Sequence, residues 1–176
     1  MKLGAKELRT KLPSEKDLKK IKKNPIYIIV DNVLDTYNVG GIFRLADAIS
    51  AKKIYLCGET ETPPHTRIKK ASINTTEWVA WQHFVDAKSA IDHLRSKIDD
   101  IAIIAIEQDK KSVSYDQIHY ELPIAFVVGH ESNGVSKKVL DSADRIAEIP
   151  MWGVNKSLNV IVSLGIVVFE ALRQNG

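Results

Sequence analysis

The chain has 176 residues, of which 44% are hydrophobic and 7% aromatic. This length supports one well-buried core and is short for two ordinary domains. The single cysteine, Cys57, excludes an internal disulfide, and the absence of a signal peptide or of an apolar run of about 18 residues predicts a cytoplasmic protein without a membrane span.

The first 24 residues carry much of the positive charge. They hold nine Lys or Arg against three Asp or Glu, while the whole chain has a net charge of +3. A basic arm can bind a polyanion by displacing counterions from phosphates, or it can be a solvated, frayed terminus, and charge alone favours neither. Ser14, followed by acidic residues, predicts a short helix over 14–23. We therefore divide the chain into a basic extension, 1–24, and a main domain, 25–176.

From Pro25 onward, strand and helix patterns alternate. Apolar runs rich in β-branched residues predict buried strands at 26–30, 54–57, 101–106, 124–128 and 145–149. Helical patterns occur at about 40–50, 87–97, 136–142 and 158–173. This alternation predicts an α/β fold with a mostly parallel sheet flanked by helices, in which ligands bind at the carboxyl ends of strands.

The segment 59–76 contains two consecutive prolines and is predicted to be a mobile surface loop. Three of its residues form a basic patch: Arg67, Lys69 and Lys70.

Three polar segments follow predicted strand ends. The first is Asn38-Val39-Gly40-Gly41-Ile42-Phe43-Arg44. Glycines at a turn into a helix would let a ligand approach the backbone, and Arg44, near the helix start, could form a forked contact with a phosphate. Taken alone, an exposed arginine at a helix N-terminus is the simpler interpretation. The dinucleotide fingerprint Gly-x-Gly-x-x-Gly is absent.

The second segment is Gly129-His130-Glu131-Ser132-Asn133-Gly134. Two glycines bracket a carboxylate at a strand end, so backbone amides and one acid can meet a polar ligand. We interpret His130 as a bystander. The five histidines are scattered and no Cys or His pair has metal-ligand spacing, so no metal site is expected.

The third segment, 149–160, leads from the last short strand into the apolar C-terminal helix. Ser157 and Asn159 place a hydroxyl and an amide at the helix entry, where Ser157 in isolation is best interpreted as an N-cap. Neither Gly-x-Ser-x-Gly nor a Ser-His-Asp set is present, so acyl hydrolysis has no support.

In order and spacing, the three segments resemble the motifs of the SpoU (TrmH) family of the SPOUT methyltransferase superfamily. The matching patterns are Asn38-x-Gly40-x-x-x-Arg44, Gly129-x-Glu131-x-x-Gly134, and Ile149-Pro150-Met151 with Ser157-Leu158-Asn159-Val160. The resemblance implies a deep C-terminal trefoil knot, a homodimer, and transfer of a methyl group from S-adenosylmethionine to a ribose 2′-hydroxyl of tRNA or rRNA. One departure is Ile161, where the family commonly has a second serine.

The resemblance also implies roles for individual residues. Arg44 matches the catalytic arginine and Asn38 supports it, while Glu131, Ser157 and Asn159 match positions that shape the site. The expected cofactor-binding residues are Gly129, Gly134, Ile149, Met151 and Leu158. The residues expected to contact RNA, beside the basic extension, are Arg44, Arg67, Lys69 and Lys70.

The reaction requires the ribose hydroxyl to lose its proton, but the guanidinium of Arg44 is a very poor base, since its pKa is above about 12. We expect an RNA phosphate and nearby polar groups to position Arg44 against the 2′-hydroxyl, where it accepts the proton or stabilises the developing alkoxide.

The short chain slightly favours tRNA over rRNA as substrate. An alternative is a catalytically silent RNA-binding or ribosome-assembly protein that keeps the knot, against which the intact motif residues argue. A dinucleotide-dependent enzyme would need the missing glycine fingerprint.

Overall fold

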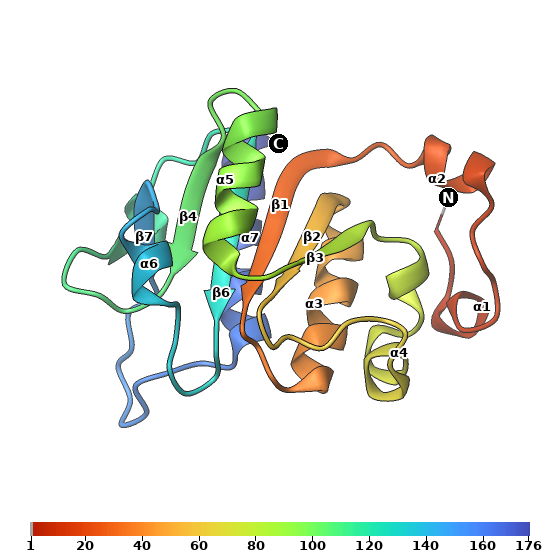
Figure 1. Ribbon diagram of the computed structural model, residues 1–176, viewed down its shortest axis with the longest axis horizontal. Helices are drawn as coiled ribbons and strands as arrows, with labels where there is room; N and C mark the ends of the chain where they lie inside the picture. Colours follow the sequence, from red (N-terminus) through yellow and green to blue (C-terminus); the bar gives the residue numbers. More distant parts are fainter. Residues whose placement is uncertain (1) are drawn as a thin grey trace.

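The computed structural model describes residues 2–176, which form a seven-stranded sheet with helices on both faces (Figure 1). Every pairing in the sheet is parallel, and the strand order is β3-β2-β1-β6-β4-β7-β5. The strands are β1 (Asn24–Asp31), β2 (Ala51–Cys57), β3 (Trp81–Phe84), β4 (Ala102–Ile106), β5 (Val113–Ser114), β6 (Ile124–Gly129) and β7 (Arg145–Glu148). The predicted α/β class with a parallel sheet is confirmed.

Helices are distributed along the whole described chain, from the basic extension to the C-terminus. They are α1 (Ala5–Leu8), α2 (Glu15–Lys20), α3 (Thr36–Ala48), α4 (Thr66–Ser72), α5 (Ala87–Lys97), α6 (Lys137–Leu140) and α7 (Val160–Asn175), with short 3-10 turns η1 (Thr75–Glu77) and η2 (Tyr115–Gln117). Ser14 caps α2, and its hydroxyl accepts a hydrogen bond from the Asp17 N–H. No helix within residues 2–176 is both long and apolar enough to cross a membrane.

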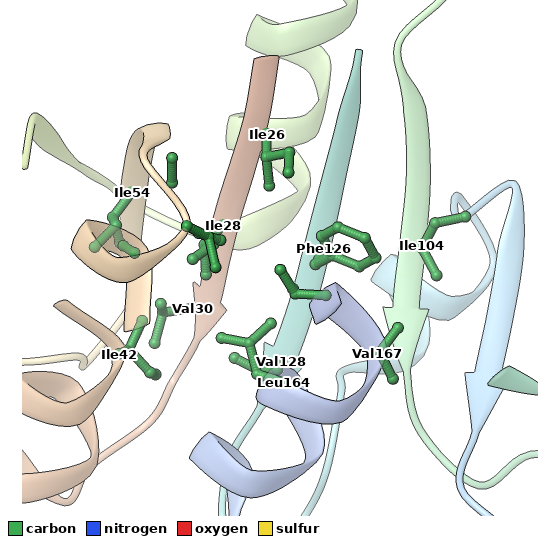
Figure 2. Close-up of a cluster of buried hydrophobic side chains, with 14 of the residues drawn as sticks. Ile26, Ile28, Val30, Ile42, Ile54, Ile104, Phe126, Val128, Leu164 and Val167 are labelled. Atoms are coloured by element: carbon green, nitrogen blue, oxygen red, sulfur yellow. The ribbon is translucent and has the colours of Figure 1, made fainter. Parts of the chain in front are cut away.

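The central strands are buried on both faces. In β1, Ile28 and Val30 belong to the core under α3 and α7, whereas Ile29 belongs to the core under α5 and α6. Figure 2 shows the first of these cores, in which Leu164 of α7 lies beside Val128 of β6. Fully burying an aliphatic side chain of this size contributes roughly 1.5–3 kcal/mol, so continuous apolar runs are what such strands require.

The strand order reverses between β1 and β6. The chain first moves outward from β1 to β2 and β3, and then resumes on the other side of β1, where β6 inserts between β1 and β4. In an open parallel sheet such a reversal opens a crevice at the carboxyl ends of the strands. Here Asp31, the last residue of β1, pairs with Gly129, the last residue of β6, so the chain leaves the sheet toward the first polar segment beside the start of the second.

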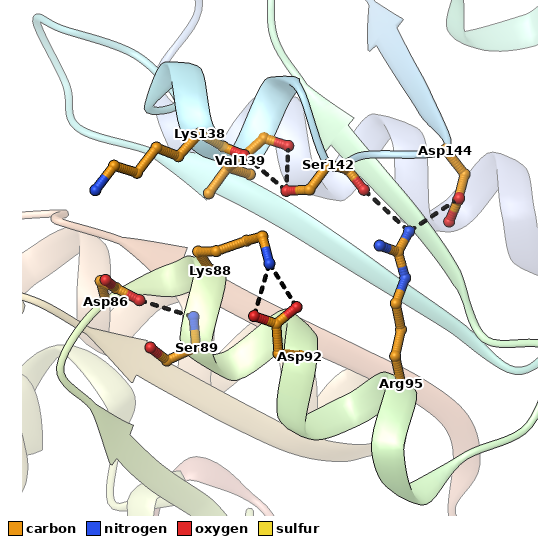
Figure 3. Close-up of polar contacts among 9 residues, drawn as sticks. All are labelled: Asp86, Lys88, Ser89, Asp92, Arg95, Lys138, Val139, Ser142 and Asp144. Carbon is orange, nitrogen blue, oxygen red and sulfur yellow. Dashed lines mark hydrogen bonds and ion pairs between the residues drawn. The ribbon is translucent and has the colours of Figure 1, made fainter.

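Polar contacts fix the connection that leads into β7 (Figure 3). Nη2 of Arg95, on α5, donates to the carbonyl oxygen of Ser142 at 2.9 Å and to the carboxylate of Asp144 at 3.0 Å. The other carboxylate oxygen of Asp144 accepts from the Ile103 N–H at 2.7 Å. These bonds hold the turn after α6 against β4, so β7 and the polar loop that follows it start from a defined position.

The end of α7 is tied to the segment that precedes β6. The Gln174 side chain accepts from the Tyr120 N–H at 3.1 Å and donates to the Ile118 carbonyl at 3.0 Å, and Asn175 donates to the Tyr120 carbonyl at 2.8 Å. The C-terminal end of α7 is therefore anchored, and its start lies at the third polar segment. The trefoil knot itself stays a prediction.

Three sequence predictions of local structure are wrong. The segment 59–76 contains α4 and η1, because Ile68 is buried in the core and holds the segment on α3. Strands β3 and β5 were not predicted, since they are short and partly exposed and so lack a continuous apolar run. The helix predicted at 40–50 begins earlier, at Thr36, where the Asp35 side chain caps it by accepting from the Tyr37 N–H at 2.8 Å.

Candidate active site

A cavity of about 510 Å³ lies at the carboxyl ends of β4, β6 and β7. All five residues predicted to bind the cofactor line it: Gly129, Gly134, Ile149, Met151 and Leu158. Glu131, Ser157 and Asn159 line it as well, whereas Asn38 and Arg44 do not. The structure thus brings the second and third polar segments together around one space.

Gly129 and Gly134 approach each other too closely for side chains. His130 and Gly134 exchange two backbone hydrogen bonds, of 3.1 and 2.8 Å. A Cβ atom on Gly129 would lie 2.2 Å from the Gly134 carbonyl carbon, and Gly134 itself has φ of +67°. Both glycines are therefore required to fold this loop back over the end of β6.

His130 stabilises the same loop from within. Its Nδ1 accepts hydrogen bonds from the backbone N–H groups of Ser132 at 3.0 Å and Asn133 at 3.3 Å. A ring nitrogen used in this way is not available as a general base. The arrangement favours the interpretation of His130 as a bystander.

Glu107 and Gln108 connect the two walls of the cavity, a role that our sequence interpretation missed. The Glu107 carboxylate accepts from the Val135 N–H and from the Gln108 N–H, each at 2.8 Å. The Gln108 side chain donates to the carbonyl of Lys156 at 2.6 Å. The position of Glu107 directly after a predicted buried strand was the available signal, because strand ends are where ligand sites gather.

Asn38, Glu131 and Asn159 form a hydrogen-bonded line across the three polar segments. Nδ2 of Asn38 donates to Oε1 of Glu131 at 3.0 Å, and Oδ1 of Asn38 accepts from Nδ2 of Asn159 at 3.0 Å. Glu131 also accepts from the N–H groups of Leu34 at 3.2 Å and Asp35 at 3.0 Å. Asn38 is buried, so these bonds replace water that it cannot reach.

Glu131 is held in its ionised form. Partial burial acts to raise the pKa of its carboxyl, but the hydrogen bonds from Asn38 and from the backbone N–H groups of Asp35 and Leu34 outweigh it and lower the pKa below its ordinary value. An ionised Glu131 can only accept hydrogen bonds, which fixes the direction of every bond in the line.

The cap of α7 is Asn159, not Ser157. Oδ1 of Asn159 accepts from the Ile161 N–H at 2.9 Å, so one side chain both starts the helix and joins Asn38. Ser157 lies two residues earlier in the exposed loop, where its N–H donates to Oδ1 of Asn155 at 3.2 Å. The simple N-cap interpretation of Ser157 is therefore wrong, and Ser157 is instead one of the residues that line the cavity.

The glycines of the first segment serve helix packing and not ligand approach. Gly40 and Gly41 lie inside α3, where a Cβ on Gly40 would lie 2.5 Å from Cβ of Ala71 and one on Gly41 would lie 2.3 Å from Cδ1 of Ile161. They allow α4 and the start of α7 to contact α3 closely. Because α3 starts at Thr36, Arg44 lies in its third turn and not near its start.

Arg44 is exposed on α3, and among residues 2–176 no hydrogen bond or ion pair engages its side chain. The basic patch predicted from Arg67, Lys69 and Lys70 lies on α4, also outside the cavity. Within the described part of the chain, no cluster of His, Cys, Asp or Glu side chains could hold a metal ion.

Cys57 offers no nucleophile. It is fully buried at the end of β2, where burial, together with the charges of Asp31 and Asp86, raises the pKa of its thiol to about 12. Only the thiolate is reactive, so this cysteine is a core residue.

Comparison with known proteins shows the family to which the chain belongs. Residues 25–169 match the SpoU rRNA Methylase family, a span that contains all three polar segments. The chain belongs to this family. The family predicted from the three motifs is thus confirmed, and with it the methyltransferase class and S-adenosylmethionine as the methyl donor.

Relatives in the SpoU family act on two kinds of RNA. A tRNA (guanosine(18)-2′-O)-methyltransferase of Aquifex aeolicus is 30% identical over 172 residues, which span 91% of this chain and 77% of that protein. The 23S rRNA (guanosine-2′-O-)-methyltransferase RlmB of Ralstonia nicotianae is 27% identical over 150 residues, which span 85% of this chain and 59% of that protein.

Solved structures of a tRNA modifying enzyme and an rRNA methyltransferase share the fold. The A. aeolicus TrmH/SpoU tRNA modifying enzyme has a TM-score of 0.79 at 27% identity, over 97% of this chain and 82% of that one. The AdoMet-bound rRNA methyltransferase of Sinorhizobium meliloti also has a TM-score of 0.79, at 29% identity, over 94% of this chain and 59% of that one.

Proposed function

We propose that this chain is a tRNA 2′-O-ribose methyltransferase that acts as a homodimer. The observation that carries the proposal is the line Glu131–Asn38–Asn159, which joins the three family motifs beside the cavity. We treat residues 25–176 as the methyltransferase domain and residues 1–24 as a basic extension that contributes to RNA binding. A cytoplasmic location stays a prediction.

The cavity suits S-adenosylmethionine. Its volume of about 510 Å³ falls in the range of about 300–1,000 Å³ that is usual for small-molecule sites. The close contact of Gly129 with Gly134 leaves backbone groups uncovered by side chains, and Ile149, Met151 and Leu158 supply apolar surface. When bound, S-adenosylmethionine supplies an electrophilic methyl group. The protein residues position the two reactants and exclude water.

Arg44 is the residue to which we assign the chemistry. Its guanidinium is exposed and unpaired within the described chain, so it can form a forked contact with an RNA phosphate. Held in this way, the guanidinium stabilises the alkoxide that develops on the 2′-oxygen, or, if it first gives up a proton to the phosphate or to solvent, the neutral guanidine accepts the proton of the 2′-hydroxyl. Asn38 lies on the same helix and fixes α3 relative to Glu131 and Asn159.

An apolar face on α7 supports the homodimer. Val162 and Phe169 are 49% and 55% exposed, and with the partly buried Ile166 they recur at the spacing of one helix face. Trp152, in the loop before α7, is 92% exposed. Exposed apolar surface of this kind is typical of an interface, and a second copy of the chain would cover it.

The choice of tRNA over rRNA rests on sequence identity. The A. aeolicus tRNA enzyme is 30% identical to this chain, and the R. nicotianae rRNA enzyme is 27% identical. The higher identity favours tRNA as the substrate.

A tritium-transfer assay tests the proposal. Methyl-labelled S-adenosylmethionine is incubated with unmodified tRNA transcripts and wild-type protein, and label in the RNA is mapped to the ribose by nuclease digestion. We expect Arg44→Ala to abolish transfer while calorimetry shows unchanged S-adenosylmethionine affinity. Lys97→Gln, which removes an exposed charge on α5, is the control and should transfer at the wild-type rate. Wild-type turnover by Arg44→Ala would exclude our assignment. Absence of transfer by the wild type to tRNA would contradict the choice of substrate, and absence of transfer to rRNA as well would favour a silent RNA-binding protein.

A further inference from the structure

A second cavity lies between the basic extension and α4, away from the candidate active site. Its volume is about 390 Å³, and it is lined by Arg9, Thr66, Lys69, Lys70 and Asn74. Figure 1 shows α1 beside α4 at one end of the molecule, whereas the loops that follow β6 and β7 lie toward the other end. The two cavities share no lining residue.

Asn74 holds the extension in place to form this cavity. Its side chain is only 3% exposed, and its Nδ2 donates to the carbonyl oxygen of Leu8, the last residue of α1, at 3.0 Å. Asn74 itself adopts φ of +68°, a left-handed conformation that asparagine tolerates better than most residues. Arg9 follows Leu8 directly, so this one hydrogen bond places an arginine of the extension beside the lysines of α4.

The cations around this cavity lack compensating charges. No Asp or Glu lines it, and within residues 2–176 no ion pair or hydrogen bond engages the side chains of Arg9, Lys69 or Lys70. Three positive charges around one cavity repel one another, and an anion bound among them offsets that repulsion by attraction to each. Thr66 adds a hydroxyl donor at the same place. Cations converging on a concavity are suited to a phosphate group.

We propose that this cavity binds backbone phosphates of the RNA substrate at a distance from the methylated ribose. The inference rests on the proposed function, because it assumes that RNA is the substrate. Helix α4 packs on α3 at Gly40, and Arg44 lies four residues further along α3, so the cavity and Arg44 are carried by two helices in direct contact. The site includes Arg9 and excludes Arg67, and therefore differs from the patch that the sequence predicts on α4 alone.

Variants that remove positive charge at this cavity or elsewhere distinguish RNA binding at the cavity from a general electrostatic effect. The double variant Arg9→Gln/Lys69→Gln is compared with Lys97→Gln/Lys138→Gln, which removes the same charge from exposed residues on the opposite face of the sheet. Binding of an unmodified tRNA transcript is measured by filter retention at several salt concentrations. We expect Kd to rise about tenfold in the first variant, and the slope of log K against log salt to fall by about 1 to 2. Equal changes in both variants would overturn the inference.

Two further measurements keep the outcome interpretable. Asn74→Ala removes the bond to Leu8 without changing net charge, and we expect it to weaken tRNA binding while leaving the salt slope closer to that of the wild type. S-Adenosylmethionine affinity, measured by calorimetry, should be unchanged in every variant, which also reports that the domain is folded. If the wild type methylates tRNA and Arg9→Gln/Lys69→Gln binds it normally, only this inference fails. If the wild type neither binds nor methylates tRNA, the proposed function fails first.

Discussion

Asn38 and Asn159 are separated by 121 residues, and a hydrogen bond of 3.0 Å joins Oδ1 of Asn38 to Nδ2 of Asn159. The other end of the Asn38 amide donates to Glu131, and the other end of the Asn159 amide caps α7. In this line each amide NH₂ group therefore acts as a donor and each amide oxygen as an acceptor, as its partner requires. As a result, the position of α3, the loop after β6 and the start of α7 depend on one another.

Replacing Asn38 by Leu should disrupt this arrangement. The change keeps the approximate volume but leaves Glu131 without its side-chain donor and Asn159 without its acceptor. Leaving such groups unpaired costs about 1–3 kcal/mol, so the free energy of unfolding measured in urea should fall by about that amount. Methyl transfer should fall as well, because α3 carries Arg44. Asn133→Ala, in the exposed loop nearby, is the control, and a loss of stability no larger than in that variant would contradict the role of Asn38.

The lowered pKa of Glu131 predicts a defined pH dependence. Because the folded state lowers the pKa of this carboxyl, ionised Glu131 contributes stability that is present above the ordinary Glu pKa of about 4.3 and is lost as pH falls through the lower folded value. In Glu131→Gln, an amide NH₂ faces backbone N–H donors in place of one carboxylate oxygen. We expect the stability difference between wild type and Glu131→Gln to be constant from pH 6 to 8 and to shrink below about pH 4.3. A difference independent of pH would show that the charge of Glu131 has no part in it.

The sequence predicts the centre of this fold better than its edges. Strands β1, β4 and β6 and the second half of β2 contain continuous apolar runs because both faces of the sheet are covered, and α5 has the predicted bounds, 87–97. The edge strand β3 is partly exposed along its whole length, so its sequence lacks the continuous apolar run that predicts a buried strand. Helix α4 was not predicted from the sequence for a different reason. Only one buried apolar residue, Ile68, attaches it to the core, and the prolines before it suggested a loop.

The same contrast holds in the candidate site. Family motifs predicted residues that line the cavity, but they did not predict which residues hold its walls together. Glu107 bonds to the Val135 N–H, a backbone group 28 residues away, and no spacing rule in the sequence records such a contact. Gly40 and Gly41 were interpreted as a ligand-binding turn, because the sequence does not show that α4 and α7 cross α3 at those positions.

The helix glycines should respond differently to alanine. Inside a helix this change normally stabilises by about 1 kcal/mol, and Gly165→Ala in α7 should do so, because its Cβ would lie 4.0 Å from the nearest side chain, Leu45. A Cβ on Gly40 would lie 2.8 Å from the Ile68 carbonyl oxygen, which cannot move without its backbone. We expect Gly40→Ala to lower the free energy of unfolding by about 1–3 kcal/mol. Thermal unfolding of the two variants, side by side, tests the opposite signs.

Gly41→Ala allows a rescue experiment. Its Cβ would meet the flexible end of Ile161, at 2.3 Å from Cδ1 but 3.1 Å from Cγ1. Ile161→Val deletes the clashing methyl group, so the double variant should regain part of the stability that Gly41→Ala loses. The coupling energy from the four proteins of this double-mutant cycle measures the contact directly. Additive effects would show that Ile161 does not limit the space at Gly41.

Glu107 should control the cavity without contributing to the chemistry. Its two carboxylate oxygens accept from Val135 and Gln108, so Glu107→Gln turns an NH₂ group toward one of these N–H donors and loosens the loop that carries Gly129 and Gly134. We expect S-adenosylmethionine affinity, measured by calorimetry, to fall several-fold, while the rate of methyl transfer at saturating S-adenosylmethionine changes little. Glu61→Gln, at an exposed position, is the matched control. A fall in the saturated rate with unchanged affinity would instead place Glu107 in the reaction itself, because an interaction made only in the transition state lowers the rate and not the binding.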